Sequence, residues 1–220
     1  LERIGPFLLG DPMKLRDTML EAHVRARDAI KSGPGSFPVG VTLAMQDYQA
    51  LPGGEEHVRR ARAESWDPFL EAARKDDFVG VQTYSRHRYD ANGPVGPEAG
   101  VPVLIMGYEF WPEALEGTVR YASKTANVPI HVTENGIGTT DDGQRIEYER
   151  RALAALVKCM RDGIDVRGYF YWSLMDNFEW LFGYGPEFGL VAVDRATQQR
   201  RPKPSAEWLG AIARANVLPD

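Results

Sequence analysis

Short apolar runs alternate along the chain with longer segments in which apolar residues recur at helical spacing. The runs are rich in β-branched residues, which is typical of strands buried on both faces; they cover 39–43, 78–84, 130–133 and 166–172. The spacing of Met19, Ala22, Ala26 and Ile30 predicts a helix before the first run. We expect helices over about 15–31, 55–74, from 112 onward, 145–161 and 205–215. This order predicts parallel strands joined by crossover helices.

Two α/β architectures fit this order of elements. One is an open, doubly wound sheet, and the other is part of a (β/α)8 barrel. No Gly-x-Gly-x-x-Gly follows the first strand, which removes the usual support for a dinucleotide-binding sheet. No linker or low-complexity segment interrupts the chain, so we expect residues 1–220 to form a single domain. Either architecture places functional groups at the carboxyl ends of the strands.

Composition excludes several classes of protein. With 26 Lys and Arg against 31 Asp and Glu, the formal net charge is −5, which lacks the basic excess of a nucleic-acid binder. We find neither a run of about 18 apolar residues nor a basic N-terminal region followed by an apolar stretch, so we expect a soluble, cytoplasmic protein.

Residues that often bind metals show no suitable pattern here. The only cysteine, Cys159, lies near an apolar helix face and is expected to be a small buried hydrophobe. The four histidines lack the spacing of a metal site, and Asp141-Asp142 is expected to form a turn. We therefore expect no bound metal.

Glu134 directly follows a predicted buried strand and precedes Asn135-Gly136. A carboxylate in this position is costly unless it is paired or used. The alternative is an Asn-Gly hairpin turn with a solvated glutamate beside it. However, residues 137–143 form a polar loop that leads into a helix, with no returning strand. This favours a functional carboxylate.

A second cluster follows the last predicted strand. Trp172, Glu179 and Trp180 set a carboxylate between two indoles, which is the composition of a sugar subsite. The alternative is a Trp-rich core edge in which Glu179 pairs with an arginine. That alternative does not require Asp176 and Asn177 to share the loop, as they do.

These motifs together resemble the C-terminal half of a glycoside hydrolase family one β-glucosidase. The resemblance is carried by Ile-His-Val-Thr-Glu-Asn-Gly at 130–136, Trp-Ser-Leu-Met-Asp-Asn-Phe-Glu-Trp at 172–180, residues 183–194 and the closing segment 201–205. It implies strands five to eight of a (β/α)8 TIM barrel. It also implies a retaining β-glycosidase without a cofactor, which hydrolyses terminal β-linked glucose from oligosaccharides or from aryl and alkyl glucosides through a glycosyl-enzyme intermediate.

The resemblance assigns a role to each matching residue. Glu134 matches the nucleophile, and Tyr84 matches the tyrosine that orients it. Trp172 matches the platform beneath the sugar, while Glu179 and Trp180 match the residues that hold its distal hydroxyls.

Several positions depart from the family pattern. Tyr108 stands where a tryptophan commonly lines the leaving-group side, so we expect it to contact substrate there. Gln82-Thr83 replaces the usual Asn-Tyr, and we expect Gln82 to bind substrate. His131 stands where an aromatic ring such as tyrosine is common.

The general acid of the family lies in an Asn-Glu-Pro segment, and these 220 residues contain none. We therefore expect this chain to supply the nucleophile but not the acid/base. A half-barrel would leave strand edges unpaired. We expect it to be completed by a complementary N-terminal half or by self-association, or to be a piece of a larger enzyme.

Two alternatives from other classes remain. One is a non-catalytic sugar-binding or scaffold half-barrel, which loss of Glu134 would have favoured. The other is a nucleic-acid module that uses the basic residues Arg195, Arg200, Arg201 and Lys203. That run is short, and we interpret it as a solvated connector.

Overall fold

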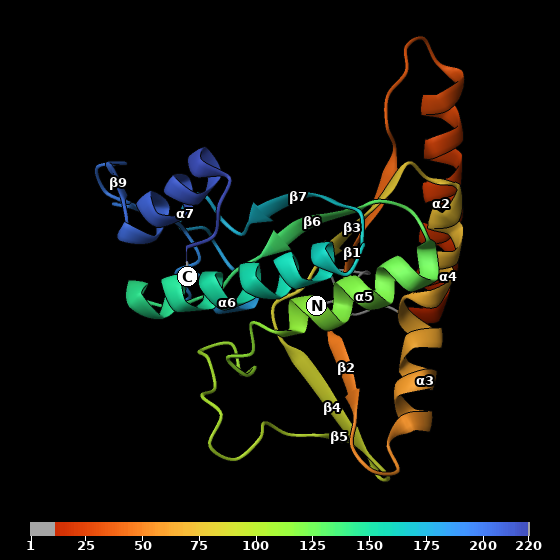
Figure 1. The fold of residues 1–220 in the computed structure, drawn as a ribbon, viewed down its shortest axis with the longest axis horizontal. Helices are drawn as coiled ribbons and strands as arrows, with labels where there is room; N and C mark the ends of the chain where they lie inside the picture. The colour runs from red at the N-terminus through yellow and green to blue at the C-terminus, as the bar shows by residue number, and fades with distance from the viewer. Residues whose placement is uncertain (1–11, 220) are drawn as a thin grey trace, which may run out of the picture.

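A four-stranded parallel sheet forms the centre of the computed structural model, which describes residues 12–219 (Figure 1). Its strands, in spatial order, are β1 (Gly40–Ala44), β3 (Phe78–Gln82), β6 (Ile130–Asn135) and β7 (Val166–Tyr171). All three neighbouring pairs are parallel. The predicted α/β order and the parallel pairing are therefore confirmed.

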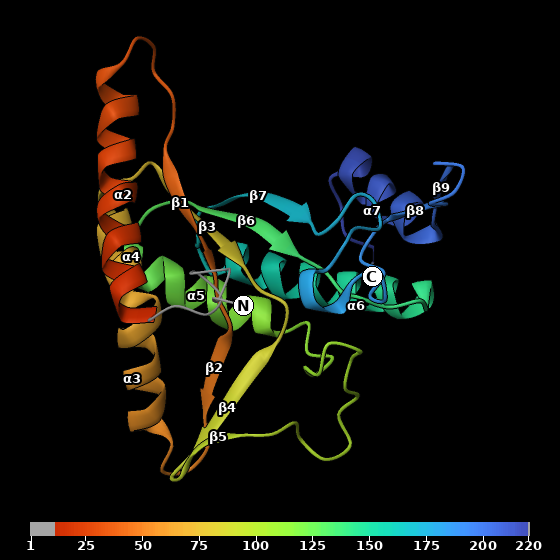
Figure 2. The same cartoon turned by 180° about the vertical axis from the view of Figure 1, so that it is seen from behind.

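Helices cover one face of this sheet. α5 (Ala114–Ala126) and α6 (Asp142–Arg161) lie side by side across it, and α7 (Pro204–Ala215) packs against α6 (Figures 1 and 2). α6 begins three residues before the predicted start because the Asp141 side chain caps it, accepting from the amides of Gly143 and Gln144 at 2.9 and 3.2 Å. The aspartate pair that was expected to form a turn is thus a helix N-terminus.

The segment predicted as one helix over 55–74 is broken. It forms α3 (Glu55–Ser65), α4 (Asp67–Ala72) and a 3-10 turn, η1 (Ala73–Lys75). Pro68 lies in the first turn of α4, where its ring would clash with the carbonyl of residue 64 in a continuous helix. A proline inside an amphipathic pattern therefore marks the true boundary.

A second sheet replaces part of what was predicted as loop. β2 (Asp47–Ala50) pairs parallel with β4 (Arg86–Asp90), and β4 pairs antiparallel with β5 (Gly93–Val95). A small hairpin of β8 (Val191–Val193) and β9 (Arg200–Pro202) precedes α7. These strands are short, and most are polar, so they lack the apolar alternation that identifies a strand in sequence.

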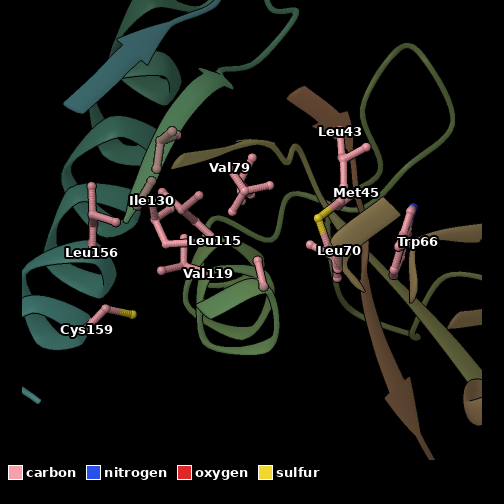
Figure 3. Packing of buried hydrophobic residues seen from close by; sticks show 14 of the residues in the cluster. Leu43, Met45, Trp66, Leu70, Val79, Leu115, Val119, Ile130, Leu156 and Cys159 are labelled. Carbon is pink, nitrogen blue, oxygen red and sulfur yellow. The ribbon is translucent and has the colours of Figure 1, made fainter. Parts of the chain in front are cut away.

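The core lies between the central sheet and its helices (Figure 3). Val79 and Ile130 from the sheet meet Leu115 and Val119 from α5, all fully buried. Each such side chain contributes about 1.5–3 kcal/mol on burial. Cys159 is buried in the same cluster, as predicted.

The opposite face of the central sheet is largely uncovered. Alternate positions on the edge strands, including Thr42, Ala44 and Phe170, are exposed there. β1 and β7 also have no neighbour on their outer edges within the part of the chain that the structure describes.

Helix α2 (Pro12–Ser32) packs beside this sheet with a face different from the one that its apolar spacing indicates. His23 and Arg27 point inward and bind opposite oxygens of Asp76, at 2.8 and 3.2 Å. The predicted apolar positions face outward, with Met19 56% and Ile30 46% exposed. No helix within residues 12–219 has the length and apolar character of a membrane span.

Candidate active site

Glu134 lies at the carboxyl end of β6, with each carboxylate oxygen held by a side chain from β3 or its following loop. The Tyr84 hydroxyl donates to Oε2 at 2.5 Å, and the Gln82 amide nitrogen donates to Oε1 at 2.9 Å. A register shift between Val81 and Gln82 brings Gln82 opposite Glu134. The hairpin alternative is wrong, because β6 continues into no returning strand and pairs in parallel on both sides.

Tyr84 acts only as a donor in this arrangement. Burial and the hydrogen bond to Glu134 raise the pKa of its phenol well above the usual value, so the hydroxyl keeps its proton at physiological pH. The phenol therefore fixes the orientation of the carboxylate.

A buried amide supports the two strand ends from behind. Asn135 donates to the Thr83 carbonyl at 2.6 Å and accepts from the Tyr169 hydroxyl at 2.9 Å. The Tyr148 hydroxyl, on α6, donates to the Tyr84 carbonyl at 2.7 Å. These contacts fix the backbones next to Glu134 and Tyr84. Neither Tyr148 nor Tyr169 was predicted as a site residue.

The glycine after Asn135 has a clear steric role. A Cβ at Gly136 would lie 2.0 Å from the carbonyl oxygen of Trp172. Only glycine therefore allows the ends of β6 and β7 to approach this closely. That approach brings Trp172 next to Glu134.

The loop after β7 carries the second predicted cluster. The Trp172 indole nitrogen donates to Oε1 of Glu179 at 3.3 Å, and the Asn177 amide donates to the same oxygen. Glu179 is thus held by an indole and an amide, and within residues 12–219 no arginine forms the ion pair that the alternative required. Trp180 is 73% exposed, so it does not form a core edge.

These groups line one open pocket of about 380 Å³. Five predicted residues meet there with the nucleophile candidate: Tyr84, Tyr108, Trp172, Glu179 and Trp180, around Glu134. Gln82 contacts the carboxylate of Glu134 but is not part of the lining. His131 lies on the open face of the sheet, edge-on to Phe78.

Three lining residues were not predicted: Gln46, Met106 and Phe188. Gln46 follows the first strand, where its position at a strand end was the available signal. Phe188 meets the ring of Tyr84 edge-on, with centroids 6.0 Å apart. Phe188 belongs to the segment 183–194 that carries the family resemblance, but no role was assigned to it, because only the fold shows that a long loop brings it to the strand ends.

A buried arginine joins the loops that bring Phe188 to the site. Arg145 on α6 donates to the carbonyls of Ile137 and Thr139, at 2.9 and 2.6 Å, and to that of Glu187 at 3.1 Å. The first two follow β6 and the third precedes Phe188. Arg145 therefore holds together the two loops that place Phe188 in the pocket wall.

A second buried arginine anchors the segment that carries Tyr108. Arg86 binds Glu109 at 2.5 Å and Glu98 at 2.6 Å, and its guanidinium stacks 3.3 Å from the ring centre of Trp111. Burial raises the pKa of the Tyr108 phenol, which therefore remains protonated. Within residues 12–219, no group of three His, Cys, Asp or Glu side chains is arranged to hold a metal ion.

Comparisons with known proteins agree with this geometry. The glycosyl hydrolase family 1 model matches residues 81–218. Beta-glucosidase A of Thermotoga maritima is 35% identical over 169 residues, which cover 70% of this chain and 38% of that protein. A beta-galactosidase of Sulfolobus acidocaldarius is 32% identical over 237 aligned positions, covering 92% of this chain and 48% of its own length.

Solved structures give the same result. The crystal structure of beta-glycosidase BGL167 aligns with a TM-score of 0.86 and 50% identity, covering 93% of this chain and 49% of that one. The apo structure of beta-glucosidase 1317 aligns with a TM-score of 0.91 and 43% identity, covering 98% and 53%. The chain spans half or less of the length of the curated relatives named here. The chain belongs to glycosyl hydrolase family 1.

Proposed function

We propose that this chain is the nucleophile-bearing half of a retaining β-glucosidase. The observation that carries the proposal is Glu134, whose two oxygens are held by Tyr84 and Gln82 at the edge of a pocket that also contains Trp172 and Glu179. A carboxylate fixed on both oxygens is preorganised to attack in one direction.

In the first step, a carboxylate oxygen of Glu134 forms a bond to the anomeric carbon while the bond to the leaving oxygen breaks. A second carboxyl group, about 5–5.5 Å away in retaining enzymes, gives its proton to that oxygen. In the second step this group takes a proton from water, and the water oxygen displaces Glu134 and restores the carboxylate. Inversion occurs twice, so the product keeps the β configuration.

The sugar is held on the β7 side of Glu134. We assign the face of Trp172 to the apolar C–H surface of a glucose ring and Glu179 to its hydroxyls. Glu179 already accepts two hydrogen bonds on Oε1, which leaves Oε2 for a sugar hydroxyl. This assignment gives Glu179 a binding role and leaves the acid/base to another part of the enzyme.

The open face of the sheet supports a half-barrel. Parallel sheets are covered on both faces in known folds, whereas here Thr42, Ala44 and Phe170 are exposed. We propose that residues 1–220 form one domain with strands five to eight of a (β/α)8 barrel. A complementary N-terminal half would pair with the free edges of β1 and β7.

The region beside β1 favours such a partner. A cavity of about 570 Å³ opens between α2 and β1, with Met19, Trp66 and Phe69 in its lining. We favour the N-terminal half over a second copy of this chain, because only the former would bring an acid/base. Its length would be close to the half of the relatives that this chain does not cover.

The test compares two substrates. General acid catalysis supplies about 10²- to 10⁴-fold, and an acidic leaving group needs it least. The chain alone is therefore expected to release dinitrophenolate slowly from 2,4-dinitrophenyl β-glucoside and to leave cellobiose intact. Addition of the N-terminal half of a family 1 relative is expected to restore cellobiose hydrolysis.

Each outcome bears on one part of the proposal. Sugar binding without any phenolate release would favour a non-catalytic sugar-binding protein. Phenolate release without restoration by the added half would remove the complementation. A stable dimer of the chain alone, seen by native mass spectrometry, would favour self-association.

A further inference from the structure

We infer that a pocket formed by the helices and β2 binds a neutral sugar without cleaving it. The pocket has a volume of about 350 Å³ and lies where α3, the start of α4, β2 and α5 meet (Figure 1). It shares no lining residue with the pocket of Glu134. None of its lining residues belongs to β1 or β7, whose outer edges we assign to the N-terminal half. Binding here therefore does not depend on the proposed function.

A buried N–H group of a residue in this lining has no acceptor. Nη2 of Arg62 donates to the carbonyl of Tyr48 at 3.0 Å, and the guanidinium lies over the ring of Tyr121, 4.0 Å from the ring centre. These contacts fix the guanidinium, yet its Nε is buried without a partner. Among the buried side-chain atoms without a partner in residues 12–219, it is the only nitrogen. Buried polar atoms are nearly always hydrogen-bonded, so an oxygen of a ligand would supply the missing acceptor.

The formal charges of the lining cancel. The basic residues are Arg59 and Arg62, and the acidic residues are Glu55 and Asp67. An anion would be attracted by the first pair and repelled by the second, and a cation would meet the reverse. A hydroxyl group both donates and accepts, so a ligand with several hydroxyls can bind to both kinds of side chain. The charge balance therefore favours a neutral sugar over an ion.

Two aromatic rings in the lining are already held in place. Tyr48 packs against Trp66, with ring centres 4.1 Å apart, and the Tyr121 hydroxyl donates to Asp67. Together with Val58, these rings offer apolar surface to the C–H groups of a sugar. The volume lies near the lower end of the range for small-molecule sites, about 300–1,000 Å³. The pocket therefore suits a monosaccharide or a disaccharide of hexoses.

Nuclear magnetic resonance of the full, isotope-labelled chain observes the Nε–H of Arg62 directly. The chain is titrated with cellobiose, and the signal is assigned through its connection to the backbone of Arg62. A saturable shift is expected, and its midpoint gives the Kd of this pocket. The indole N–H of Trp172 reports on the pocket of Glu134 in the same spectra. Sodium acetate, added at the same concentrations, is expected to shift the Arg62 signal less than cellobiose does.

A matched pair of variants tests the lining. Glu55→Ala removes an exposed carboxylate of the pocket and leaves Arg62 in place as the reporter. It is expected to raise the cellobiose Kd at the Arg62 signal by about 10-fold or more, the effect of one hydrogen bond to a charged group, without changing the Kd at Trp172. Glu71→Ala makes the same change on an exposed residue of α4 outside the pocket and is expected to match wild type. Circular dichroism checks that both variants are folded.

The two signals separate this site from the pocket of Glu134. Absence of a saturable shift at Arg62 in wild type would overturn the inference, and so would a larger shift with acetate than with cellobiose. A Glu55→Ala variant that changes the Kd at both signals equally, or leaves the Kd at Arg62 unchanged, would also overturn it. A Trp172 signal that does not respond to cellobiose would count against the proposed function and leave the second pocket standing.

Discussion

Replacing Glu134 by Gln is expected to slow phenolate release from an activated aryl β-glucoside by a factor on the order of 10³ or more. An amide does not attack the anomeric carbon, so the glycosyl-enzyme cannot form. The new side chain still accepts from Tyr84, and Gln82 can rotate its own amide to match the added NH₂ group. The fold and the sugar affinity should therefore be retained.

Tyr84→Phe provides a graded comparison. It leaves the nucleophile and removes one of its two hydrogen bonds, which for a charged acceptor corresponds to about a 10- to 100-fold loss of rate. Glu207→Gln makes the same chemical change as Glu134→Gln on an exposed residue of α7 and should match wild type. The rate of phenolate release, followed by absorbance, is measured for all three variants. Turnover by Glu134→Gln within tenfold of wild type would exclude Glu134 as the nucleophile.

Replacing Glu149 by Leu is expected to stabilise the protein at neutral pH. Glu149 lies fully buried on α6, and neither carboxylate oxygen has a hydrogen-bond partner. Burial raises its pKa to about 8 from 4.5, against a smaller opposing effect of Arg145. The folded state thus holds a proton that the unfolded state releases.

The sign of the pH dependence follows from this raised pKa. The contribution of the protonated Glu149 to the free energy of unfolding is fully present below pH 4.5. This contribution decreases as the pH rises above 4.5 and is lost once the pH has passed 8. At pH 7 the loss is about 3 kcal/mol, at about 1.4 kcal/mol for each unit between the unfolded pKa and the solution pH. Leucine does not ionise, so the variant avoids this loss.

Urea unfolding at pH 5, 7 and 9 measures the effect. The advantage of Glu149→Leu over wild type is expected to grow from pH 5 to 8 and then to level off. Glu147→Leu changes an ion-paired residue two positions earlier on the same helix and should not reproduce this rise. An advantage that does not vary with pH would mean that Glu149 does not titrate in this range.

Much of the central sheet and its helices could be predicted from sequence, because buried parallel strands are apolar runs and surface helices are periodic. The strands β2 and β4 could not, because Asp47–Ala50 and Arg86–Asp90 gain their structure from pairing with each other. The buried face of α2 that its apolar spacing predicts was also wrong. Its apolar positions face outward, and two polar side chains, His23 and Arg27, bind inward to Asp76.

Of the candidate site, too, only a part could be predicted from the sequence. Glu134 and the loop with Trp172 and Glu179 could be identified because strand ends concentrate functional groups. Gln46 also follows a strand, but its position there was the only signal, and a single neutral amide has no motif around it that would select it. Phe188 depends on the bonds of Arg145 to three loop carbonyls, which only the folded chain reveals.

The most direct test of the account is to trap the intermediate. The chain is incubated with 2,4-dinitrophenyl 2-deoxy-2-fluoro-β-glucoside, digested and mapped by mass spectrometry. We expect one fluoroglucosyl group on the peptide that contains Glu134 and none in Glu134→Gln. Reversible sugar binding with no adduct, or an adduct on Glu179 instead, would contradict the account.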